Sequence, residues 1–223
     1  MKQPSQVMIV SGGTCNPNGI KELIINHQID TIIAVDGGLK ILDELNIMPD
    51  YIVGDFDTVS PELVDKYRHL TLNQKAPVIR SFQPEKDDTD TEIAIRLCIE
   101  LQAKEVVITA ATGTRLDHTL ANIHLLKLLL DEEIPAAIYD LHNKIYLIQD
   151  TLKLKQSKLY GKYFSMLPFT QRVTGITLTG FKYPLTNKTI DFGTSLCISN
   201  EVIQSEAVVE LNEGILIVFE SYD

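Results

Sequence analysis

The sequence predicts an α/β fold class in two parts: a parallel sheet with covering helices, followed by antiparallel β-structure. Through residue 141, short apolar runs that end in glycine or aspartate alternate with segments of helical periodicity. This alternation indicates a parallel sheet with helices on both faces. From residue 142 on, short apolar runs are separated by glycines, which indicates an antiparallel sandwich or partial barrel. We therefore predict a Rossmann-like α/β domain at residues 1–141 and an antiparallel β-sandwich domain at 142–223.

The N-terminal elements follow from local signals. Asn16-Pro17 and Ser60-Pro61 each combine an N-cap residue with proline at the first helical position. Thr89 and Glu92 form the capping-box pattern of a further helix. Strands are expected at 7–10, 31–35, 51–53, 78–82, 106–110 and 136–139, and helices at 17–27, 39–45, from 61 on, 93–101 and 116–130.

The C-terminal elements are expected to be short strands. Apolar residues alternate at Ile145 and Leu147, and again at Ile176 and Leu178, as in strands that bury one face. Glycines and the turn at 212–214 separate these runs. No repeat or low-complexity segment interrupts the pattern.

Composition narrows the possible functions. The 223 residues are 44% hydrophobic and carry a formal net charge of −10, with three widely spaced cysteines. This charge disfavours a nucleic-acid partner, and the cysteine pattern disfavours a disulfide scaffold or a zinc site. No apolar run reaches the ~18 to 20 residues that cross a bilayer, and the first residues lack a signal-type core. We expect a cytoplasmic protein that binds neither nucleic acid nor membrane.

Two acidic motifs follow predicted strands and indicate a metal site. Asp55 and Asp57 are two residues apart in one loop, a spacing that lets both carboxylates share a magnesium ion. Asp87 lies just outside the Thr89 cap, and Asp90 lies in the first turn of the helix that follows. Parallel strands end at one edge of a sheet, so these carboxylates should meet there and repel one another unless a cation lies among them.

Other interpretations of these motifs stay open. A strand followed by Asp-x-Asp-x-Thr is also the pattern of haloacid-dehalogenase-type phosphatases, in which the first aspartate, here Asp55, is the nucleophile. Against that interpretation, the motif follows the third predicted strand rather than the first, and Gly54 directly precedes it. A solvated acidic turn without a ligand is the remaining alternative.

Two further loops have features of nucleotide sites. The loop 36–38, Asp-Gly-Gly, ends the second predicted strand. Its glycines would let a nucleotide approach the backbone, and the Asp36 carboxylate could bind ribose hydroxyls or a metal-bound water, although an ordinary turn has the same sequence. The loop 113–118 opens a helix and offers Arg115 to phosphate, but Arg115 and Asp117 also suit a surface ion pair. His118 has a ligand contact and a structural hydrogen bond as open alternatives. No GxGxxG fingerprint is present.

Taken in order, five motifs resemble those of the thiamine pyrophosphokinase family. They are Asp36-Gly37-Gly38, Gly54-Asp55-Phe56-Asp57-Thr58, Asp87-Asp88-Thr89-Asp90, Gly113-Thr114-Arg115-Leu116-Asp117-His118 and Ser199-Asn200. The resemblance implies a kinase, dependent on Mg2+, that transfers a diphosphoryl group from ATP to thiamine and gives AMP and thiamine diphosphate. It further implies a nucleotide-binding catalytic α/β domain, a thiamine-binding β domain, and a homodimer with thiamine between one subunit's N-domain and the other's C-domain.

The resemblance also implies roles for individual residues. Metal binding falls to Asp55, Asp57 and Asp87, with Asp90 beside them. ATP binding falls to Asp36, Gly37, Gly38, Thr112, Gly113, Arg115, Asp117 and His118. Thiamine binding falls to Tyr183, Ser199 and Asn200. The chain departs from the family in having no tryptophan, which some relatives carry at the Tyr183 position, and in having Cys197 where glycine is commoner.

The residue types suit this reaction. Diphosphoryl transfer requires positioning of the hydroxyl and neutralisation of phosphate charge. We expect Asp90 to orient or deprotonate the thiamine hydroxyl and Arg115 to steady the phosphates. Tyr183 in an acidic cleft would suit the permanent cation of thiamine. Asp88 has no assigned role. A non-catalytic nucleotide-binding regulator stays open as the other alternative, and it would bind ATP without turnover.

Overall fold

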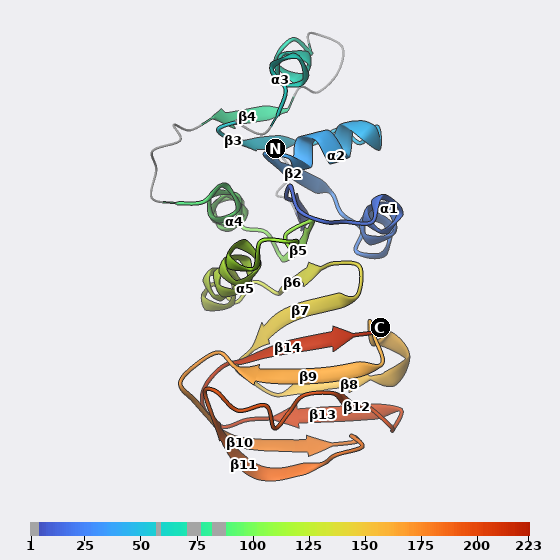
Figure 1. The fold of residues 1–223 in the computed structure, drawn as a ribbon, viewed down its shortest axis with the longest axis vertical. Helices are drawn as coiled ribbons and strands as arrows, with labels where there is room; N and C mark the ends of the chain where they lie inside the picture. The colour runs from blue at the N-terminus through green and yellow to red at the C-terminus, as the bar shows by residue number, and fades with distance from the viewer. Residues whose placement is uncertain (1–4, 57–58, 71–76, 82–87) are drawn as a thin grey trace. The chain divides into compact units, whose positions relative to one another are not determined.

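The chain forms two compact units, Met1–Leu141 and His142–Asp223. The computed structural model describes residues 5–56, 59–70, 77–81 and 88–223; Figure 1 shows the ribbon. The first unit contains helices and a parallel sheet, whereas the second is built from antiparallel strands.

The described part of the first unit has one parallel sheet of six strands. Their order is β6-β5-β1-β2-β3-β4. The chain therefore changes direction across the sheet between β1 and β5, and in open α/β sheets such a switch point is where ligands bind. The strands are β1 (Gln6–Val10), β2 (Thr31–Val35), β3 (Tyr51–Gly54), β4 (Val78–Ser81), β5 (Glu105–Thr109) and β6 (Ala136–Tyr139).

Helices cover both faces of this sheet. In Figure 1, α4 and α5 lie together on one face, and α1 and α2 lie on the other. Burial on both sides explains why every residue of β2 is buried. The helices are α1 (Pro17–Asn26), α2 (Gly38–Glu44), α3 (Pro61–Arg68), α4 (Asp90–Glu100) and α5 (Leu116–Asp131).

The second unit is a β-sandwich. One sheet has the order β12-β9-β14-β7 and the other β11-β10-β13-β8, and residues such as Phe164, Val173, Val209 and Val218 form the apolar core. The elements are β7 (Asn143–Ile148), β8 (Leu152–Lys155), the 3-10 helix η1 (Gln156–Lys158), β9 (Tyr163–Pro168), β10 (Arg172–Thr179), β11 (Leu185–Asp191), β12 (Asn200–Glu201), β13 (Glu206–Glu210) and β14 (Leu216–Ser221).

The predicted fold class is confirmed, with small shifts at element ends. Helix α4 begins at Asp90, as the predicted cap at Thr89 requires, and its polar first turn precedes the apolar segment that was expected from residue 93. The expected N-caps are present, since the side chains of Asn16, Ser60 and Thr89 each accept a backbone hydrogen bond from the first turn. Within the described ranges, every helix is too short or too polar to span a bilayer.

Candidate active site

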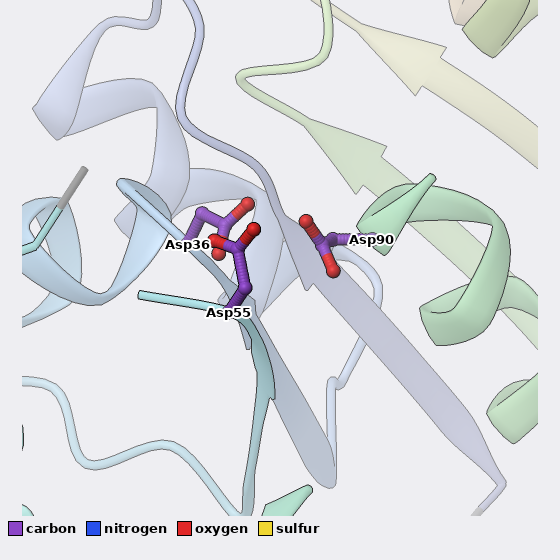
Figure 2. Close-up of side chains that lie close together, drawn as sticks. All are labelled: Asp36, Asp55 and Asp90. Atoms are coloured by element: carbon purple, nitrogen blue, oxygen red, sulfur yellow. The ribbon is translucent and has the colours of Figure 1, made fainter. Parts of the chain in front are cut away.

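Three carboxylates meet at the carboxyl edge of the parallel sheet. Asp36 directly follows β2, Asp55 directly follows β3, and Asp90 is the first residue of α4. Strands β2 and β3 are neighbours, with Val35 paired to Val53, so their ends deliver Asp36 and Asp55 to the same place. Figure 2 shows these two carboxylates side by side and Asp90 facing them. One ligand oxygen from each residue lies within 4.8 Å of the other two. We call Asp36, Asp55 and Asp90 the acidic cluster.

The backbone around the acidic cluster is unusual. Asp36 has φ 43° and Phe56 has φ 64°, in the left-handed region that non-glycine residues seldom adopt. Gly54 has φ 152°, and a Cβ atom there would collide with Oδ1 of Asp36. A side chain at position 54 would therefore displace the Asp36 carboxylate, which gives a physical reason for glycine directly before Asp55.

Burial and like charges shift the titration of the acidic cluster. The pKa of Asp36 is raised to about 7, first by burial, then by a hydrogen bond with Asp90 and by the charges of Asp90 and Asp55. The backbone N–H of Phe56 acts in the opposite direction. Oδ1 of Asp36 is buried, and the structure provides no hydrogen-bond partner for it among the described residues. The acidic cluster therefore offers hard oxygen ligands close together, and the buried Asp36 oxygen has no hydrogen-bond partner among the described residues, which fits a divalent cation such as Mg2+.

The structure changes the membership of the predicted metal site. Asp55 and Asp90 lie in the acidic cluster, whereas Asp57 and Asp87 fall outside the described residues. Asp36, expected to contact the nucleotide, is a full member of the acidic cluster. The signal that could have revealed this was its position at the end of a neighbouring parallel strand, the same signal that marked Asp55.

The start of α4 positions Asp90 through its cap and through a contact to β1. The hydroxyl oxygen of Thr89 accepts a hydrogen bond from the N–H of Glu92 at 3.3 Å. The hydroxyls of Ser11 and Thr91 lie 3.4 Å apart and link the end of β1 to the residue after Asp90.

An ion pair also accounts for Asp88, which had no predicted role. Asp88 Oδ2 lies 3.6 Å from Nε of Arg96. The same guanidinium donates to Oε1 of Glu92, with Nη2 at 2.6 Å. The Glu92 side chain thus pairs with Arg96 on the exposed side of α4.

The loops after β1 and β5 are joined at the switch point by backbone hydrogen bonds. Ser11 N–H donates to Thr109 O at 3.0 Å, Gly13 N–H to Ala110 O at 2.6 Å, and Thr14 N–H to Thr112 O at 2.8 Å. Two side chains outside the loop after β5 also form hydrogen bonds with it. Asn122 Nδ2 donates to Ala111 O at 2.7 Å, and the Thr112 hydroxyl donates to Asp140 Oδ2 at 3.2 Å.

The roles of Asn122 and Asp140 in holding this loop were not expected from the sequence. Their hydrogen-bond partners lie far from them in sequence and become neighbours only in the folded chain. Gly37 and Gly38 lie next to the same loops. A Cβ atom on Gly37 would lie 3.2 Å from Gly12 Cα, and a Cβ atom on Gly38 would collide with the Val10 carbonyl. Close packing at the switch point therefore explains both glycines independently of a ligand.

The residues at the start of α5 are exposed. Arg115 is the N-cap residue without a side-chain cap, and its Nη2 lies 2.6 Å from Asp117 Oδ2, with the two side chains 69% and 65% exposed. The hydrogen bond from Arg115 lowers the pKa of Asp117 to about 2. Gly113 and His118 are likewise exposed. The surface ion pair considered from sequence is thus present, and it leaves the guanidinium accessible to an anion.

The predicted thiamine residues lie together in the β-sandwich unit. The Tyr183 side chain is 60% exposed, and its backbone N–H and C=O both bond to the side chain of Asn200, at 3.0 and 2.9 Å. Ser199 is exposed, has φ 57°, and its N–H donates to the Ser165 hydroxyl at 2.9 Å. We call Tyr183, Ser199 and Asn200 the Tyr183 corner.

A parallel sheet that gathers carboxylates and glycine loops at its carboxyl edge, followed by a β-sandwich, defines a Rossmann-like α/β protein whose ligands bind at that edge. Residues 22–138 match the family model "Thiamin pyrophosphokinase, catalytic domain", and residues 149–216 match "Thiamin pyrophosphokinase, vitamin B1 binding domain". The thiamine pyrophosphokinase of Bacillus subtilis is 35% identical over 218 residues, 97% of this chain and 99% of that protein.

Solved structures agree with the sequence match. The crystal structure of the Bacillus subtilis protein superposes with a TM-score of 0.86 at 30% identity, covering 98% of this chain and 100% of that chain. The thiamin pyrophosphokinase of Geobacillus thermodenitrificans gives a TM-score of 0.81 at 33% identity, with 98% of both chains covered. The chain belongs to the thiamin pyrophosphokinase family, which confirms the resemblance inferred from the five motifs.

Proposed function

We propose that this chain transfers the diphosphoryl group of ATP to the hydroxyl of thiamine and releases AMP. The thiamine oxygen bonds to the β-phosphorus while the bond from that phosphorus to the oxygen it shares with the α-phosphorus breaks, so AMP leaves with that oxygen. The observation that carries the proposal is the acidic cluster at the sheet edge, in a chain that matches both domains of the family.

We propose that Asp36, Asp55 and Asp90 hold Mg2+, together with Asp57 and Asp87 from the sequence prediction. The ion, when bound, supplies positive charge to the phosphate oxygens. The Asp36 oxygen without a hydrogen-bond partner among the described residues supports this role, and so does the raised pKa of its carboxyl, which burial and then the neighbouring Asp90 and Asp55 carboxylates cause. Asp90, at the free N–H end of α4, orients the thiamine hydroxyl and accepts its proton.

We propose that the nucleotide binds along the loops at the switch point. Gly37 and Gly38 allow a close approach to the backbone, Thr112 and Gly113 lie in the loop after β5, and His118 lies in the first turn of α5. Arg115 exchanges the carboxylate of Asp117 for phosphate, which its exposure permits. Asn122 and Asp140 hold this loop in place through Ala111 and Thr112.

We propose that thiamine binds at the Tyr183 corner, with the aromatic ring against the cationic ligand. The chain would act as a homodimer in which thiamine lies between one subunit's N-domain and the other's C-domain. Mixing Asp55→Asn and Tyr183→Ala subunits tests this arrangement at thiamine concentrations where each variant alone is inactive. Reassorted mixed dimers should recover up to about a quarter of wild-type activity. No recovery would place each site within one subunit.

The phosphatase alternative is not favoured by the family matches. It predicts release of inorganic phosphate and trapping by beryllofluoride at Asp55. The regulator alternative predicts ATP binding without turnover. Incubating the protein with ATP, Mg2+ and thiamine separates all three, because only the kinase forms AMP and thiamine diphosphate together and only when thiamine is present. Absence of both products from folded protein would refute the proposed function.

A further inference from the structure

The side chain of Asn200 is buried inside the β-sandwich unit and makes three hydrogen bonds there. It is 5% exposed. Its Oδ1 accepts hydrogen bonds from the N–H of Tyr183 at 3.0 Å and of Glu201 at 2.9 Å, and its Nδ2 donates to the carbonyl of Tyr183 at 2.9 Å. An amide oxygen has two lone pairs, so these bonds use the full acceptor capacity of Asn200.

These bonds extend a pairing between two chain segments. The backbones of Phe181 and Val202 form an antiparallel bridge, and the N–H of Lys182 donates to the carbonyl of Glu201 at 2.9 Å. At Tyr183 the side chain of Asn200 replaces a backbone partner, because it forms hydrogen bonds with both the N–H and the C=O of Tyr183. The backbone of Tyr183 is therefore held on both sides although its ring is 60% exposed.

A second set of contacts restrains the ring itself. Lys182 Nζ lies 5.6 Å from the centroid of the Tyr183 ring, within cation–π range. That ammonium also lies 2.7 Å from Oε1 of Glu201, the residue whose N–H is bound by Asn200. Asn200 therefore links the backbone of Tyr183 to the residue that anchors the cation beside its ring.

We propose that Asn200 is a positioning residue, which sets the place of the Tyr183 ring for thiamine and does not itself bind thiamine. The inference rests on the proposed function and on thiamine contact by Tyr183. It differs from the role implied by the motif, in which Asn200 contacts the ligand. A side chain with its oxygen saturated and 5% exposure has no acceptor to offer a ligand, whereas the neighbouring Ser199 is exposed.

A double-mutant cycle tests the proposal. Thiamine KM, ATP KM and kcat are measured for wild type, Asn200→Ala, Tyr183→Ala and the double variant. We expect each single substitution to raise the thiamine KM by about tenfold, and the double variant to match Tyr183→Ala, because residues that act through one contact are not additive. The ATP KM should stay unchanged. Multiplied effects in the double variant would indicate a direct contact by Asn200 and would overturn the proposal, as would an unchanged thiamine KM in Tyr183→Ala.

Gln156 offers a matched control. Its Nε2 donates to the carbonyl of Val202 at 3.0 Å, so it also holds this segment through a side-chain amide, but it does not touch Tyr183. Gln156→Ala should leave the thiamine KM unchanged; an increase like that of Asn200→Ala would mean general loosening and would refute a specific role. If Asn200→Ala does not fold, Asn200→Asp takes its place in the cycle, since it keeps the acceptor and loses the donor to Tyr183. These outcomes can be told apart from a failure of the proposed function, because in that case the wild type itself would form no thiamine diphosphate.

Discussion

The acidic cluster and the Tyr183 corner are built on opposite principles. In the acidic cluster, Asp36 keeps a buried oxygen without a hydrogen-bond partner among the described residues, and its pKa is raised by burial and then by neighbouring carboxylates. In the Tyr183 corner, the buried Asn200 makes three hydrogen bonds, two of which hold the backbone of the exposed Tyr183. The first arrangement places like charges close together, a repulsion that a bound cation would relieve, whereas the second satisfies its hydrogen bonds without a ligand. Substitutions at the two places should therefore change stability in opposite directions.

The largest effect should come from removing a carboxylate of the acidic cluster. Asp55→Asn should lower kcat by about 100-fold or more, because the metal and the phosphate charges lose a ligand. The melting temperature of the metal-free protein should not fall. Asp131→Asn is the control, since Asp131 lies in an exposed ion pair with Lys127. If Asp55→Asn kept the full kcat, Asp55 would have no role in the reaction.

Removing the Asn200 side chain from the Tyr183 corner should lower the stability of the protein. Asn200→Ala leaves the N–H groups of Tyr183 and Glu201 without their acceptor, which should cost about 2 kcal/mol of unfolding free energy. Chemical denaturation with an unchanged slope measures it. Asn200→Asp, which keeps the acceptor, should lose less than Asn200→Ala. Equal losses would show that the accepted hydrogen bonds are not the stabilising ones.

Removing a charge from the acidic cluster should raise the stability of the metal-free protein. Asp36→Asn removes a charge from the group whose pKa is raised from 3.8 to about 7. Below about pH 3 the carboxyl is protonated in both states and does not affect stability. As the pH rises toward 7 the unfolded state ionises first, so wild type loses stability, and the loss is constant above that range. Asp36→Asn in metal-free buffer should therefore be more stable by about 1 kcal/mol above pH 7, after solvent screening, and equal to wild type below about pH 3. Urea denaturation at both pH values checks the sign.

The smallest effect on stability is expected at Arg115. Its ion pair with Asp117 is exposed, so Arg115→Ala should leave the melting temperature unchanged while raising the ATP KM by about tenfold. Arg172 provides a close match, because its Nε lies 2.6 Å from Asp191 and the two side chains are 64% and 60% exposed. Arg172→Ala should change neither quantity. An unchanged ATP KM in Arg115→Ala would leave Arg115 as a surface residue.

The α/β unit was predictable from sequence because its signals are local. The bounds of β2, Thr31–Val35, and the cap at Thr89 follow from apolar runs and capping residues. The sequence predicted Asp36 at the same sheet edge as Asp55, with ribose hydroxyls or a metal-bound water as its partner. Its direct place beside Asp55 was not predicted, because it depends on the pairing of β2 with β3 and on the space left by Gly54.

The Tyr183 corner was predictable only as a set of residues carried over from a family. The two-residue strand β12 has no periodicity to detect. The bonds of Asn200 join positions 17 residues apart in sequence, and such long-range partners depend on the packing of the sandwich. The inward orientation of Asn200 and the outward exposure of Ser199 therefore required the structure.

Cation binding at the acidic cluster is the central claim, and a titration of metal-free protein with Mn2+ tests it most directly. Mn2+ accepts the same oxygen ligands as Mg2+, and electron paramagnetic resonance measures the free ion. Wild type should bind Mn2+, and Asp36→Asn should bind it at least about tenfold more weakly, with Asp131→Asn equal to wild type. Equal affinity in wild type and Asp36→Asn would contradict the account.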